Sequence, residues 1–204
     1  MKDSTRFRLP GFVLVTFATT MLPVPAEAHL NSTGMGPVYD GLIHFVTSPE
    51  DLVPVLALAM LAGLRGANFG RRALFVLPAA WLLGGVFGIG APAATNNTLV
   101  TAAGLLLLGG LLSLGANVSL RGTTVLAALL GLHHGYLNGT GMGEAGTAVS
   151  TVFGLGLGVF ALVALAAAFV VPLRASWARV AVRVEGSWIA ASGLLTLAWA
   201  VRAR

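Results

Sequence analysis

Long apolar stretches constrain this chain of 204 residues more than any other feature. Several reach about 20 residues, the length that crosses a hydrocarbon core of about 30 Å. Hydrophobic residues make up 56% of the chain and charged residues 9%, which is more apolar than a water-soluble domain of this size. The sequence therefore predicts an all-α fold, a polytopic bundle of transmembrane helices.

Glycine, proline and arginine breaks divide the chain after residue 50 into about six hydrophobic spans. The first and the fourth are short, and the segment Val38–Ser48 is expected to dip into the outer leaflet and extend the first. The predicted spans are Asp51–Leu64, Arg72–Ile89, Thr98–Asn117, Thr123–Leu137, Gly146–Val171 and Val180–Val201.

The first 28 residues have the pattern of a signal peptide. A basic start (Lys2, Arg6 and Arg8) precedes the short apolar run Gly11–Leu22, and Ala26-Glu27-Ala28 places small residues at the cleavage positions. Cleavage after Ala28 would leave residues 29–204 as a single transmembrane domain with His29 at its extracytoplasmic N-terminus. There the α-amine and the imidazole of His29 could chelate a divalent ion together.

Arginine placement indicates how the helices are oriented. The net charge of +5 comes from arginines in short loops, so it reports membrane orientation rather than nucleic-acid binding. With the mature N-terminus outside, the outer loops around Ala91–Asn97 and Gly139–Gly146 contain no lysine or arginine. This pattern predicts a multi-pass membrane protein with its mature N-terminus outside the cytoplasm, and only the C-terminal Arg202-Ala203-Arg204 departs from it.

A short motif occurs twice, and all four histidines lie near one copy or the other. Leu30–Gly36 and Leu137–Gly143 share the pattern Leu-Asn-x-Thr-Gly-Met-Gly. The predicted topology puts both copies in outer loops that lead into inward-running helices. We therefore expect paired scaffolds around one outer site, with Met35 and Met142 adding soft sulfur, rather than inverted repeats.

Candidate ligands accompany the first copy. Asp40 and His44 are four residues apart, so on a helix they share one face, and a carboxylate in a membrane usually faces the bundle interior. The alternative for Asp40 is a local hydrogen bond near a water-exposed helix end. Glu50 and Asp51 follow Ser48-Pro49, and we interpret them as acids favoured by the helix dipole at a helix start.

The second copy has its own candidates. His133 and His134 point about 100° apart on a regular helix, so both could ligate one ion only if the neighbouring glycines break that helix. Asn138 and Glu144 are candidates for supporting roles in the loop. The runs Gly84–Gly88 and Gly154–Gly158 favour close helix packing over a pore role.

These features resemble the HupE/UreJ family, particularly its divergent second branch, over essentially the whole chain. The resemblance rests on the signal peptide, the spans, an Asp and a His ahead of the first span, and His134-Gly135-Tyr136. The family's N-terminal pattern is a His followed after five residues by an adjacent Asp-His pair, whereas here ten residues separate His29 from Asp40 and three separate Asp40 from His44. The family's next His-Gly is Asn138-Gly139 here. The resemblance implies a protein of a bacterial inner membrane that takes up nickel or cobalt for hydrogenase and urease maturation.

The predicted function is a permease for a divalent transition-metal ion, nickel or cobalt, with zinc and copper left open because imidazole and carboxylate ligands suit several of these ions. Capture by His29, Asp40 and His44 would be followed by transfer to His133 or His134. No P-loop motif occurs, so no nucleotide is expected. The expected partners are the lipid bilayer and the ion, an outer-membrane or periplasmic metal supplier is left open, and no nucleic acid is expected.

Two other classes of function stay open at this point. An intramembrane zinc-dependent hydrolase could use His and Asp ligands with Glu144 as base, although no Gly-x-Ser-x-Gly elbow occurs. A metal-binding sensor or assembly protein could hold an ion without moving it, for example copper through Met35 and Met142.

Overall fold

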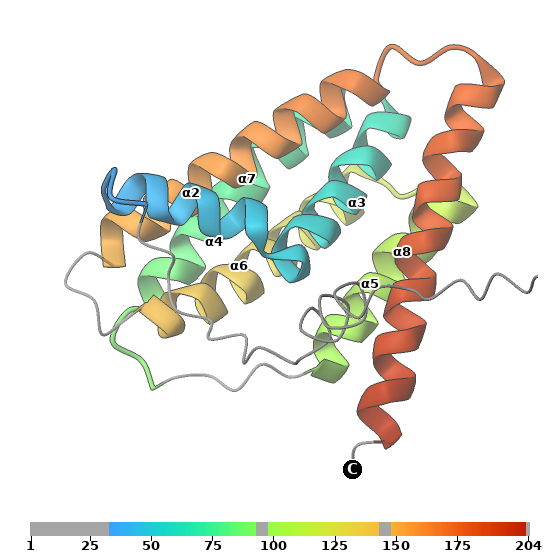
Figure 1. Ribbon diagram of the computed structural model, residues 1–204. Helices are drawn as coiled ribbons and strands as arrows, with labels where there is room; N and C mark the ends of the chain where they lie inside the picture. Colours follow the sequence, from blue (N-terminus) through green and yellow to red (C-terminus); the bar gives the residue numbers. More distant parts are fainter. Residues whose placement is uncertain (1–32, 93–97, 143–147, 203–204) are drawn as a thin grey trace, which may run out of the picture.

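The computed structural model describes residues 33–92, 98–142 and 148–202, and within them it is a bundle of α-helices without strands (Figure 1). The predicted all-α fold is therefore confirmed. The signal peptide, His29 and Glu144 lie outside the described residues. The helices are α2 (Pro37–Thr47), α3 (Pro49–Arg65), α4 (Ala67–Gly88), α5 (Thr98–Leu114), α6 (Leu120–Met142), α7 (Ala148–Val170) and α8 (Ser176–Arg202).

Each predicted hydrophobic span coincides with one of the helices α3 to α8. In the described part of the chain, α4, α7 and α8 are long and apolar enough to cross a membrane. Helices α2 and α3 pass the same test together, as a pair bent by 75°. Helix α5 is apolar but has 17 residues. The chain is thus a helical membrane protein, and six crossings stay a prediction.

Glycines determine how α4 packs on α6. Along α6, Gly131, Gly135 and Gly139 lie against Leu77, Trp81 and Gly85 of α4. Because both series of residue numbers rise together, the two helices run parallel. A Cβ atom at Gly135 would overlap the carbonyl oxygen of Trp81, so small residues are what permits this backbone approach.

The same device joins α7 to α2 and α4. Gly154 lies against the backbone of Val38, and Gly158 lies against the ring of Phe45, so α2 runs parallel to α7. Gly85 contacts Val152, whereas Gly70 contacts Ala167, so α4 runs antiparallel to α7. The packing role predicted for the runs Gly84–Gly88 and Gly154–Gly158 is confirmed.

Helices α5 and α8 form a second pair, which lies side by side at one edge of the bundle (Figure 1). Gly109 of α5 meets Gly186 and Ala190, and Gly193 of α8 meets Leu106, so this pair is antiparallel. The opposite face of α8 is apolar and uncovered, with its three tryptophans exposed. Such a face suits contact with lipid.

The α2–α3 break lies beside the middle of α7. Phe45, at the end of α2, is 1% exposed and packs beside Gly158, near the middle of α7. The chain turns at Ser48, and α3 begins at Pro49. In Figure 1 the two helices meet at a wide angle beside α7. Phe45 and Asp51, on either side of the turn, are buried, whereas Pro49 and Glu50 are exposed, so the new helix N-terminus has one buried side. The bent pair resembles a discontinuous transmembrane helix.

The duplicated motif adopts two different conformations, so the prediction of two equivalent loops is wrong. Before α2, Gly34 and Gly36 have positive φ angles of 73° and 105°, and Met35 is 62% exposed. The second copy instead continues α6 to Met142, which is 3% exposed. Packing of Gly139 on α4 holds this copy in the helix despite its glycines. Only the placement of both copies at one end of the bundle agrees with the expectation.

Candidate functional site: a buried Asp-His-Asn network

Asp51 is the centre of the most polar cluster inside the bundle. It lies in the first turn of α3, where Ser48 accepts hydrogen bonds from the amides of Asp51 and Leu52. Its side chain points inward, and the residue is 3% exposed. Nδ1 of His134 lies 2.8 Å from Oδ1 of Asp51, and Nδ2 of Asn138 donates to Oδ2 at 2.9 Å. Both carboxylate oxygens therefore meet a donor from α6.

Asn138 closes the network on its own helix. Its Nδ2 also donates to the carbonyl oxygen of His134, one turn earlier, at 2.9 Å. Both partners of this amide nitrogen are acceptors, which fixes the orientation of the side-chain amide. Asn138 thus bridges Asp51 to the backbone of the histidine that shares its carboxylate.

Aromatic rings hold His134 from the sides. The ring of Trp81 stacks on it, with centroids 5.6 Å apart and planes at 26°. Phe45 meets Trp81 edge-on at 5.9 Å, and His133 meets His134 edge-on at 5.3 Å. Nε1 of Trp81 is buried and has no hydrogen-bond partner among the described residues. The result is a tightly packed imidazole in a largely apolar interior.

This geometry gives the two ring nitrogens of His134 different roles, because Nδ1 faces Asp51. A carboxylate can only accept, so opposite an ionised Asp51 it is Nδ1 that donates. In the neutral ring Nε2 then keeps its lone pair. A carboxylate that orients a histidine in this way is the usual support of a metal-ligating imidazole. Charge-assisted hydrogen bonds also offset the desolvation of a buried carboxylate.

The predicted ligands Asp40 and His44 share α2, as expected from their spacing. Oδ1 of Asp40, however, accepts hydrogen bonds from the amide and the hydroxyl of Thr33, at 2.6 and 2.7 Å. Of the two roles expected for Asp40, this oxygen therefore has the local hydrogen-bonding one. His44 is half-buried, one residue before Phe45. In residues 33–92, 98–142 and 148–202, no three His, Asp or Glu side chains converge so that they could hold a metal ion.

His133 and His134 lie on an unbroken helix, so the helix break that both would need to ligate one ion does not occur. Their ring planes are 88° apart, and only His134 is buried. The glycines around them pack against α4 instead of breaking α6. The two histidines therefore have different environments, and Asn138 is the predicted supporting residue that contacts one of them.

The interpretation of Asp51 as an acid that serves only the helix dipole is wrong. That interpretation fits Glu50, which is exposed at the same helix start. Asp51 instead faces α6, where His134 and Asn138 contact its carboxylate. A sequence signal was available: His44 is followed after five residues by the adjacent acids Glu50 and Asp51. This is the spacing of the His and Asp-His pattern of the HupE/UreJ family, with Glu and Asp in the last two positions.

Comparison with known protein families identifies the same family. The chain matches the family model described as HupE / UreJ protein over residues 17–196. Comparison with curated proteins and with solved structures gives no match. The family is associated with nickel and cobalt uptake or with accessory roles, and it is not known as a family of enzymes. Because the match covers most of the sequence, including every helix that carries the network, the chain belongs to the HupE/UreJ family.

Proposed function

We propose that the protein is a permease that moves a divalent transition-metal ion, nickel or cobalt, into the cell. The observation that carries this proposal is the buried network of Asp51, His134 and Asn138 at the α2–α3 break of a HupE/UreJ family member. Discontinuous helices often form ion sites inside transporters. A buried imidazole is also a ligand that nickel and cobalt accept.

In this proposal Nε2 of His134 is the intramembrane ligand and Asp51 is its positioning residue. His29, Asp40 and His44 capture the ion at the outer end of the bundle, and His133 assists its transfer. Because few ligands converge among the described residues, the ion would keep water molecules in its remaining positions. Weak binding of this kind allows release on the other side.

The membrane potential is a sufficient source of energy. Two positive charges that move toward a negative interior gain about 4.6 kcal/mol per 100 mV, at about 2.3 kcal/mol for each charge. Uptake should therefore proceed without nucleotide and should slow when the potential is removed.

The test is uptake of radiolabelled nickel and of radiolabelled cobalt into proteoliposomes with a negative interior. We expect saturable uptake by the wild type, its loss in His134→Ala and His44→Ala, and a smaller decrease in His133→Ala. Ser192→Ala is the matched control, because its hydroxyl donates only along the exposed side of α8. Saturable binding without uptake would contradict the proposal and favour a sensor or assembly protein.

A further inference from the structure

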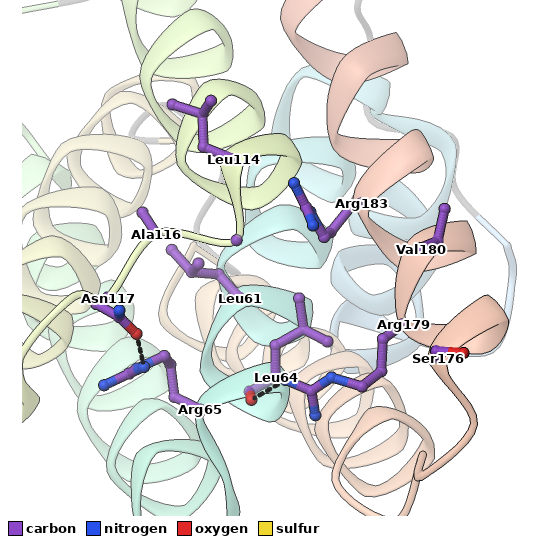
Figure 2. Close-up of a pocket in the computed structure, with 11 residues that line it drawn as sticks. Leu61, Leu64, Arg65, Leu114, Ala116, Asn117, Ser176, Arg179, Val180 and Arg183 are labelled. Atoms are coloured by element: carbon purple, nitrogen blue, oxygen red, sulfur yellow. Dashed lines mark hydrogen bonds between the residues drawn. The ribbon is translucent and has the colours of Figure 1, made fainter.

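A second polar site lies at the other end of the bundle, where α3 and α5 end and α8 begins. Here a pocket of about 330 Å³ opens between the three helices (Figure 2). Arg65 enters it from α3, and Arg179 and Arg183 enter it from α8. Leu61 and Leu114 form apolar parts of its wall. The pocket thus combines cationic groups with an apolar surface.

The three arginines have neutral partners. Arg65 donates to the side chain of Asn117, Nη2 of Arg179 donates to the carbonyl oxygen of Leu64 at 3.2 Å, and Nε of Arg183 donates to the carbonyl oxygen of Ser113 at 2.8 Å. No carboxylate lines the pocket among the described residues. Each guanidinium has five N–H donors, so most of their donor capacity is not used by these bonds.

One of these unused donors is enclosed by protein. Nε of Arg65 is buried and has no hydrogen-bond partner within the described ranges. The guanidinium carbon of Arg65 lies 5.2 Å from the centroid of the Phe69 ring, which holds the side chain in place. Arg65 is therefore a fixed positive charge at the wall of the pocket, which an anion in the pocket would neutralise.

The surrounding backbone also favours an anion. Arg179 and Arg183 are one turn apart on α8 and share a face. Arg183 packs closely on Gly115, whose φ is 60°, and a Cβ there would lie 3.3 Å from Nε of Arg183. Ser176, the first residue of α8, lines the pocket as well, so the positive end of the helix dipole points the same way.

We infer that this pocket binds a phosphate group. Guanidinium forks match phosphate oxygens, and three of them can neutralise its charge. The phosphate could belong to an anionic phospholipid headgroup, with acyl chains along the apolar wall, or to free phosphate. The positive-inside rule predicts that this arginine-bearing end faces the cytoplasm, where basic pockets between helices bind lipid headgroups.

The experiment measures binding to the purified full-length protein in detergent by native mass spectrometry and by the shift in unfolding temperature. The probes are dioleoylphosphatidylglycerol, dioleoylglycerol with the same chains but no phosphate, and inorganic phosphate. The double variant Arg179→Gln with Arg183→Gln removes two of the cations. Arg72→Gln is the matched control, because Arg72 is exposed and does not line the pocket.

We expect dioleoylphosphatidylglycerol or phosphate to bind and to raise the unfolding temperature, whereas dioleoylglycerol does neither. The double glutamine variant should bind about tenfold more weakly or worse, and Arg72→Gln should bind like the wild type. If the glutamine variant folds poorly, Arg179→Lys with Arg183→Lys keeps the charge and should bind with intermediate affinity. Stronger binding of the lipid or of phosphate identifies the source of the group. Equal weakening by Arg72→Gln, or unchanged binding in the double variant, would overturn the inference.

Discussion

Replacing Asp51 with asparagine tests whether the network prepares His134 for a metal. The substitution keeps the size of the side chain but replaces one acceptor oxygen with a donor NH2 group. In the wild type both oxygens accept, from Nδ1 of His134 at 2.8 Å and from Nδ2 of Asn138 at 2.9 Å. An asparagine can satisfy only one of these donors without rearrangement.

Either orientation of the new amide impairs metal binding. If its nitrogen faces His134, Nδ1 must become the acceptor, and the proton then occupies Nε2, where the metal would bind. If its nitrogen faces Asn138, two donors oppose each other. A buried unsatisfied donor costs about 1–3 kcal/mol, and loss of a group that orients a metal ligand typically reduces affinity or activity about 10–100-fold. The two estimates agree, because each 1.4 kcal/mol is about tenfold.

The assay is the half-saturation concentration of nickel uptake, combined with the nickel affinity of the purified protein. Asp51→Asn should raise both the half-saturation concentration and the dissociation constant about 10–100-fold. Glu50→Gln removes the same charge from the exposed neighbouring position and should leave both unchanged. Equal values for Asp51→Asn, Glu50→Gln and the wild type would refute the assignment of Asp51 as the positioning residue of His134.

Three further predictions follow from the same contacts. Gly135→Ala should destabilise the protein by about 1–3 kcal/mol in reversible unfolding, because the new Cβ overlaps the Trp81 carbonyl. A Cβ at Gly141, on the same helix, meets no atom within 4 Å, so Gly141→Ala should be neutral or stabilising. Equal effects of the two substitutions would contradict close packing of α6 on α4 at Gly135. Asn138→Ala should lower the free energy of unfolding by about 1–3 kcal/mol, since Asp51 loses a donor. A double-mutant cycle with Asp51→Asn should give a non-zero coupling energy. Strict additivity would show that the two side chains do not act together. In a variant that keeps Trp81 as its only tryptophan, cobalt or nickel should quench Trp81 fluorescence in a saturable way, because the His134 ring stacks 5.6 Å away. Quenching that persists in His134→Ala would place the ion elsewhere.

The apolar runs and their glycines were enough to predict the helices and two of the segments that pack closely. Long stretches with few charges leave little alternative to membrane helices. The glycine runs at Gly84–Gly88 and Gly154–Gly158 also indicated close contacts that the structure contains. What the sequence did not reveal is the partner of each run, since packing against a distant helix leaves no local pattern.

Asp51 shows why the candidate site was harder to predict than the fold. An acid in the first turn of a helix already has a sufficient local explanation in the dipole and the free amides. The contact that gives Asp51 another role joins residues 83 positions apart. The prediction of a loop at the glycine-rich second copy of the motif was wrong for a related reason. Gly139 is held in α6 by packing against the backbone of α4, although glycine itself has a low helix propensity. In both cases tertiary contacts decided between local alternatives.

If the proposed permease binds its ion at His134, the hydrogen bonds of the network suit passage of the ion better than its permanent storage. Nδ2 of Asn138 donates to Asp51 and to the carbonyl of His134, and both oxygens of Asp51 accept from α6, so these groups are engaged in orienting one imidazole. A storage or structural site would instead direct several such groups at the metal. In the proposed permease one rigid imidazole would supply selectivity for ions that accept nitrogen ligands, while water in the other positions would keep affinity low enough for release. Adding a ligand should therefore tighten binding and slow transport. Asn138→His is expected to lower both the dissociation constant for nickel and the maximal uptake rate. A variant with tighter binding and faster uptake would contradict this reasoning.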